Sequence, residues 1–158
     1  MTPGWWAATL LVLAPPAPES PALAAWHGDW VGEGQAFGKP ATATLDIGAG
    51  EEGATRLSYR LAIAGAPPVR YSAEAMYRID AKSRVTGTWT DSYGASRPVA
   101  GVVDAGKWAV HWGAADSEIG RSTYTLEAAD RLVVNDSVLQ DDGSWRLFAS
   151  LAYRRKSP

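Results

Sequence analysis

Apolar and polar residues alternate with a period of two along most of the chain after residue 25. Such alternation is typical of strands whose two faces meet different surroundings. It predicts ten strands, over residues 26–37, 41–47, 55–64, 69–79, 84–91, 97–103, 107–113, 121–128, 132–139 and 145–154. No stretch in this part of the chain has the apolar spacing of a helix. We therefore predict an all-β fold of about ten short antiparallel strands.

Short turns between the predicted strands favour a single up-and-down β-barrel. Closure removes the exposed strand edges at which open sheets aggregate. A barrel of this strand number leaves an interior of ligand size. The first strand contains Gly28, Gly32 and Gly34, and glycines inside a strand mark tight bends or sites where another backbone comes too close for a side chain.

The N-terminus has the pattern of a signal peptide. An apolar run over residues 5–14 is followed by a proline-rich stretch and by the small-x-small sequence Ala22-Leu23-Ala24. We predict that residues 1–24 are the signal peptide and 25–158 the barrel domain, which is periplasmic or secreted after cleavage near Ala24. The leader lacks the Lys or Arg that usually precedes the apolar run. We expect no membrane span in the mature chain.

Composition excludes several function classes. The formal net charge is −2 and no basic stripe is present, so we expect no nucleic-acid partner. The absence of cysteine excludes disulfides, thiolate metal sites and cysteine nucleophiles. Two histidines cannot supply a three-histidine metal site, and the sequence contains no G-x-S-x-G motif. We expect no metal and, more generally, no enzymatic activity.

The segment Gly28-x-Trp30, followed by Gly32-Glu33-Gly34, resembles the first-strand signature of the calycin barrels. These are the lipocalins, the fatty-acid-binding proteins and the ten-stranded nitrobindin-like haem proteins. The similarity covers about seven residues. It implies a calycin-like barrel in which Trp30 closes one end and packs against a basic residue near the last strand, which would be Arg154 or Arg155.

The same resemblance raises the question of a haem. Nitrobindin-like proteins bind iron through a histidine on a late strand, and this chain has no histidine after His111. His111 alternates to the face opposite its neighbours Trp108 and Trp112. It therefore points inward only if the two tryptophans cover the outside of the barrel.

Two segments in the middle of the strand order, residues 87–92 and 120–124, mix aromatic, polar and small residues, as the lining of an amphiphile pocket does. The candidate ligand-binding residues are Tyr59, Tyr77, Trp89, Arg121 and Tyr124. The alternative is that Trp89 and Tyr124 belong to the core and that Arg121 pairs with a surface carboxylate. The carboxylates that could fall inside the barrel are Glu74, Asp91, Glu127 and Asp136, although solvated strand faces are the simpler interpretation for each.

We predict an exported calycin-like barrel, monomeric or weakly self-associating, that binds a small hydrophobic or amphipathic molecule without catalysis or a cofactor. One alternative is a haem protein with His111 as the cofactor ligand. The other is a structural or interaction module of the cell envelope with a packed interior.

Overall fold

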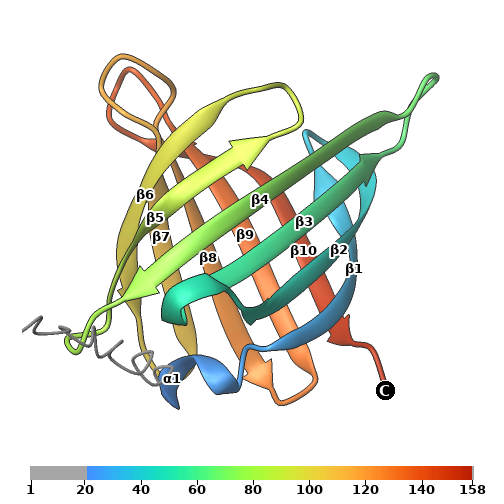
Figure 1. Ribbon diagram of the computed structural model, residues 1–158. Helices are drawn as coiled ribbons and strands as arrows, with labels where there is room; N and C mark the ends of the chain where they lie inside the picture. The colour runs from blue at the N-terminus through green and yellow to red at the C-terminus, as the bar shows by residue number, and fades with distance from the viewer. Residues whose placement is uncertain (1–20, 158) are drawn as a thin grey trace, which may run out of the picture.

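The computed structural model describes residues 21–157 and shows a closed barrel of ten antiparallel strands (Figure 1). Each strand pairs with its sequence neighbours, and β1 pairs with β10 to close the ring. The strands are β1 (Gly28–Ala36), β2 (Lys39–Ala49), β3 (Thr55–Ile63), β4 (Val69–Ile79), β5 (Arg84–Asp91), β6 (Ser96–Val103), β7 (Lys107–Trp112), β8 (Gly120–Ala128), β9 (Arg131–Leu139) and β10 (Trp145–Arg155). The predicted fold class is confirmed.

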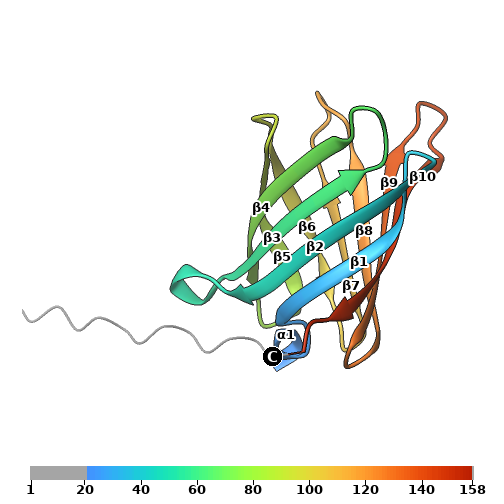
Figure 2. The ribbon, with the colours of Figure 1, turned by 90° about the vertical axis from the view of Figure 1, so that its right-hand side faces the viewer.

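Two short helical segments were not predicted from the alternation. Helix α1 (Pro21–Ala24) lies at one end of the barrel, close to the end of the chain, and η1 (Glu51–Gly53) joins β2 to β3 (Figures 1 and 2). Residues 1–20 of the predicted leader lie outside the described residues, whereas residues 21–24 of that leader form α1, so cleavage near Ala24 would remove this helix and its Leu23 from the base. Within the described residues, no helix is long and apolar enough to cross a membrane.

The first strand needs glycine where other residues pack onto its backbone. A Cβ atom at Gly32 would lie 2.5 Å from the ring of Tyr153, and one at Gly28 would lie 2.5 Å from the guanidinium of Arg155. Gly28 also has a φ of +138°, which side-chain-bearing residues rarely adopt. Both positions therefore agree with the close approach expected from the sequence.

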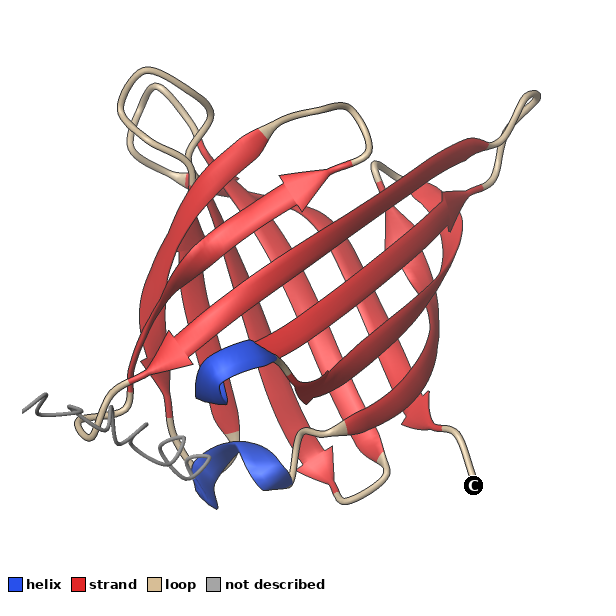
Figure 3. Cartoon of the chain, in the orientation of Figure 1, coloured by secondary structure: helices blue, strands red, loops and turns tan. Residues whose placement is uncertain are grey.

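The loops gather at the two ends of the barrel (Figure 3). The end beside α1, called the base here, is filled with large side chains. Trp26, Trp30 and Trp108 are fully buried there, and the ring of Trp108 meets those of Trp26 at 6.1 Å and Tyr77 at 5.0 Å between centroids. Leu23 in α1 joins this core with 3% exposure. Buried side chains therefore fill the base and close this end of the barrel.

A β-bulge changes the direction of side chains along β10. The pairing with β9 shifts between Leu147 and Ala149. A regular period of two would place Trp145, Leu147 and Ala149 on one face, but Leu147 is 56% exposed whereas Ala149 is buried. The regular alternation fails here because one extra residue in the strand reverses it. Phe148, next to the shift, lines the barrel interior instead.

Candidate functional site

The half of the barrel opposite the base encloses a cavity of about 390 Å³. This half is called the upper half, and its loops surround the mouth of the cavity. The inner wall includes Tyr59, Tyr124, Val134, Asp136, Ala149 and Tyr153, whereas Phe37, Val69, Tyr93, Arg97, Glu118 and Phe148 lie toward the mouth. Aromatic rings therefore dominate the lining, and few polar groups interrupt them.

The mouth carries apolar side chains that water can reach. Tyr93 is 72% exposed, Phe37 61% and Val69 47%. The ring of Phe37 stacks on that of Phe148, with 5.0 Å between centroids and 22° between planes. An apolar molecule would therefore meet a favourable surface before it reached the interior.

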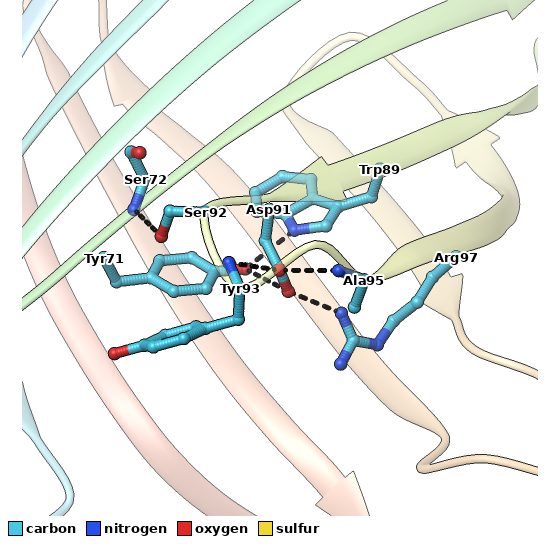
Figure 4. Close-up of polar contacts among 8 residues, drawn as sticks. All are labelled: Tyr71, Ser72, Trp89, Asp91, Ser92, Tyr93, Ala95 and Arg97. Carbon is cyan, nitrogen blue, oxygen red and sulfur yellow. Dashed lines mark hydrogen bonds and ion pairs between the residues drawn. The ribbon is translucent and has the colours of Figure 1, made fainter.

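A hydrogen-bonded network on β4, β5 and β6 and in the turn between β5 and β6 forms one wall of the mouth (Figure 4). Trp89 Nε1 donates to Tyr71 Oη at 2.8 Å, and Tyr71 Oη lies 3.5 Å from Asp91 Oδ2. Asp91 Oδ2 also accepts a hydrogen bond from Arg97 at 2.7 Å, in an ion pair whose carboxylate side chain is only 4% exposed. The arrangement fixes the two rings and neutralises the acid.

The turn that follows β5 folds back onto Asp91. The backbone N–H groups of Tyr93 and Ala95 donate to Asp91 Oδ1 at 3.0 and 3.1 Å. Burial by itself would raise the pKa of Asp91, but Arg97 and these two N–H groups outweigh it and hold the pKa below its usual value. Asp91 is therefore an ionised structural carboxylate whose hydrogen-bonding capacity is already in use.

A second polar chain lies deeper, on β7, β8 and β9. Trp112 Nε1 donates to Ser122 Oγ at 3.1 Å, and Ser122 Oγ donates to Asp136 Oδ1 at 2.6 Å. Burial raises the pKa of Asp136 to about 6, and the Ser122 hydrogen bond opposes that rise. Within residues 21–157, Asp136 forms no ion pair and accepts no other hydrogen bond. It is a carboxylate without a counter-ion.

Tyrosines surround this carboxylate. Burial is the main reason that the pKa values of Tyr59, Tyr124 and Tyr153 are raised, and the negative charge of Asp136 adds to the rise at each. These phenols therefore remain neutral. The Tyr153 hydroxyl, on a side chain that is 2% exposed, interacts with the Tyr59 hydroxyl, and this contact between the two phenols also contributes to their pKa shifts.

Three of the five predicted ligand-binding residues line the cavity: Tyr59, Trp89 and Tyr124. The other two do not. Tyr77 is fully buried against Trp108 in the base. Arg121 stacks on the ring of Trp145 at 4.5 Å from its centroid, on the strand face opposite that of Ser122. The prediction for these two was wrong. Alternation does not give the height of a side chain in the barrel, which decides the position of Tyr77. It also does not tell which face of a strand points inward, which decides the position of Arg121.

His111 lies outside the barrel. Its neighbours Trp108 and Trp112 point inward, the first into the base and the second to the cavity wall. The imidazole is exposed and lies 5.6 Å from the Trp145 ring. It therefore cannot ligate a haem bound in this cavity. Among the described residues, no group of three His, Asp or Glu side chains is placed to hold a metal ion.

The basic residue that covers Trp30 is Arg155. Its guanidinium lies 4.2 Å from the centroid of the Trp30 ring, and it donates to the backbone oxygens of Ala25, His27 and Ala129. Arg154 is exposed on the opposite face of β10. Of the two arginines that the resemblance implied, Arg155 is therefore the one that packs on Trp30, and Arg154 is not.

Sequence reasoning missed several lining residues. Tyr71 alternates on the same strand face as Tyr77 but is not among the predicted residues, and Trp112 enters the sequence analysis only as a neighbour of His111. Asp91 and Asp136 had been named as carboxylates that could fall inside, and both do, whereas Glu74 and Glu127 are exposed. Phe148 had no detectable signal, because the bulge that turns it inward does not show in the pattern.

No model of a protein family matches this sequence, and no curated protein sequence matches it. The properties of the cavity itself must therefore carry any statement about function.

Proposed function

We propose that the protein is an exported, non-catalytic binder that holds one small amphipathic molecule in the upper half of its barrel. The observation that carries this proposal is the cavity of about 390 Å³ bounded by inward-facing side chains of the strands. Small-molecule sites have volumes of roughly 300–1,000 Å³ and a mostly apolar lining with a few placed polar groups. The cavity has both properties.

The contrast with the base supports binding over a purely structural role. A structural module could be packed throughout its length, as this barrel is around Trp108. The upper half instead places small side chains, Ala149 and Ser122, opposite its aromatic rings. Atoms that line an empty cavity lack dispersion contacts on one side. A bound molecule would supply these contacts.

The calycin resemblance and the export of the protein belong to the same proposal. The up-and-down closure and the Arg155 contact over Trp30 support the resemblance. Export rests on the sequence of residues 1–24. The mass of the protein recovered from a secreting host tests it, with a mature chain beginning at Ala25 as the expected result.

A cavity-filling variant tests the binding. The neutral dye N-phenyl-1-naphthylamine becomes fluorescent in apolar pockets, and we expect saturable binding to the wild-type protein. Ala149 is 3% exposed and faces the cavity, so Ala149→Phe fills the space that the dye needs. We expect a loss of affinity of at least about tenfold.

The matched control is Ala152→Phe, which adds the same ring to the exposed face of the same strand. It should leave dye binding unchanged. Thermal melts of both variants establish that they are folded. Equal dye affinity in Ala149→Phe and the wild type would contradict binding in this cavity.

A further inference from the structure

We infer that the ligand of this cavity is a small amphipathic cation, a protonated amine on an apolar or aromatic body, and that Asp136 is its counter-ion. The inference rests on the proposed function and names the chemical class of its ligand. Three observations support it. Asp136 has no positively charged partner among the described residues, the other charges at the cavity favour a cation, and aromatic rings line the cavity.

Asp136 is placed to receive a hydrogen-bond donor from inside the barrel. It lines the cavity from β9, and its register partner on β10 is Ala149, whose side chain offers no polar group. In the part of the chain that the structure describes, Oδ1 is the only oxygen of Asp136 with a donor, the hydroxyl of Ser122. An ionised carboxylate can accept about four hydrogen bonds, so Oδ2 is left for a ligand.

The other charges at the cavity favour a cation over an anion. The single arginine of the lining, Arg97, is already paired with Asp91. Glu118 adds a further acidic side chain at the mouth. An anionic amphiphile such as a fatty acid would meet Asp136 and Glu118 without a free cation to receive its head group. A cationic amphiphile would meet attraction along the whole path.

Aromatic rings supply the second half of a site for an amine. Tyr59, Tyr124 and Tyr153 line the same cavity as Asp136, and their titration is influenced by its charge, so the acid and the rings share one desolvated space. Trp89 and Tyr71 continue the aromatic wall toward the mouth. Ring faces attract cations within about 6 Å, most strongly where water is excluded.

The pairing has a consequence for pH. The pKa of Asp136 is about 6 in the free protein, so the ion pair is available above that pH and must displace a proton below it. The titratable groups that the charge of Asp136 influences are all tyrosines, and their raised pKa values keep them neutral: Tyr59, Tyr71, Tyr77, Tyr124 and Tyr153. Asp91, held by Arg97, and Glu118 lie nearer the mouth.

A series of probes with one apolar chain and three head groups tests the inference. Octylamine, 1-octanol and octanoate are titrated into the full-length mature protein at pH 7.5 by calorimetry. Salt at 0.15 M, for which the Debye length is about 8 Å, screens the surface charges. We expect octylamine to bind roughly ten- to a hundredfold more tightly than 1-octanol, and octanoate to bind most weakly.

Asp136→Asn, which keeps the shape of the side chain, should abolish the preference for octylamine while 1-octanol still binds. The control Asp141→Asn removes an exposed acid from the turn between β9 and β10 and should retain the preference. A folded Asp136→Asn protein that still prefers the amine overturns the inference.

A measurement on the wild-type protein covers the case in which the variant does not fold. Octylamine affinity should fall by up to about tenfold per pH unit below pH 6, and 1-octanol affinity should not fall. Parallel curves for the two probes overturn the inference. If 1-octanol or octanoate binds as tightly as octylamine, the amine assignment fails and the proposed function survives. If neither the naphthylamine dye nor any of the three probes binds, the proposed function fails.

Discussion

The two halves of the barrel are built by the same ten strands and the same alternation, yet one is solid and the other hollow. Strand β7 shows the difference. Trp108 is fully buried in the base among other rings, whereas Trp112, four residues later on the same face, lines the cavity and is partly exposed. Period-two patterning decides which face points inward. The volumes of the residues that meet there decide whether the interior is filled.

The halves also differ in polarity. The base buries rings and aliphatic side chains, and its charged group, Arg155, stacks over Trp30 and is satisfied by three backbone oxygens. In the upper half, Asp136 is partly buried and, among residues 21–157, has one hydrogen bond and no counter-ion. Unpaired buried charge destabilises a fold. The comparison therefore assigns stability mainly to the base and is consistent with the ligand binding that we propose for the upper half.

The largest expected effect separates the halves on one strand. Trp108→Ala should lower the free energy of unfolding by about 3–5 kcal/mol, because it removes a fully packed ring. Trp112→Ala should lower it by no more than about half as much, because part of that ring already faces open space. Urea denaturation followed by circular dichroism measures both. Equal losses would show that the upper half is packed as tightly as the base.

The next prediction concerns Asp136 and pH. A carboxyl whose pKa is raised from 3.8 to about 6 in the folded protein binds a proton more readily there than in the unfolded chain. Stability is therefore relatively higher at low pH and is lost as the pH rises from about 4 to about 6. Asp136→Asn should stabilise the ligand-free protein by about 1–3 kcal/mol at pH 7.5 and by little at pH 4.

Urea midpoints at the two pH values measure this difference, and Asp141→Asn should shift neither midpoint. A destabilising Asp136→Asn at pH 7.5 would mean that the carboxylate has a stabilising partner. That result would give Asp136 a structural role in place of the ligand-binding role that we infer.

A smaller effect is expected at the edge of the base. Arg155→Gln removes the cation over Trp30 and donors to three backbone oxygens, so we expect a loss of about 1–2 kcal/mol. Arg154→Gln, on the exposed face of β10, should change stability by less than about 0.5 kcal/mol. Thermal melts compare the two. Similar losses would remove the special role of Arg155 in closing the base.

The fold could be predicted from the sequence because strand number and turns follow from local alternation. The ten predicted strands correspond to the ten strands of the barrel. The order of the strands in the barrel required no additional information, because each strand pairs with its neighbours in the chain and β1 pairs with β10. Local information was therefore sufficient for the architecture.

The site could be predicted only in part, because it depends on properties that are not local. Whether Tyr77 lies in the base or at the cavity depends on its height along a tilted strand. Whether the side chain of Phe148 points inward depends on one bulge. The lack of a counter-ion at Asp136 within the described residues depends on strands that are far apart in the sequence and surround the same space. Alternation placed Asp136 among the possible inward acids but could not show what faces it.

The smallest expected effect tests the boundary between inside and outside on β8. Arg121 stacks on Trp145 at the outer surface, and the next residue, Ser122, bonds Asp136 inside. Arg121→Ala should cost about 0.5–1 kcal/mol of stability and leave octylamine affinity unchanged. Ser122→Ala removes the hydrogen bond that lowers the pKa of Asp136, so the pH below which octylamine affinity falls should move upward. Calorimetric titrations between pH 5 and 8 measure both variants. The contrary result would be a shift in the pH dependence of octylamine affinity that is as large in Arg121→Ala as in Ser122→Ala. The outer arginine would then influence the cavity as strongly as the inner hydroxyl, and the two faces of β8 would not be separated.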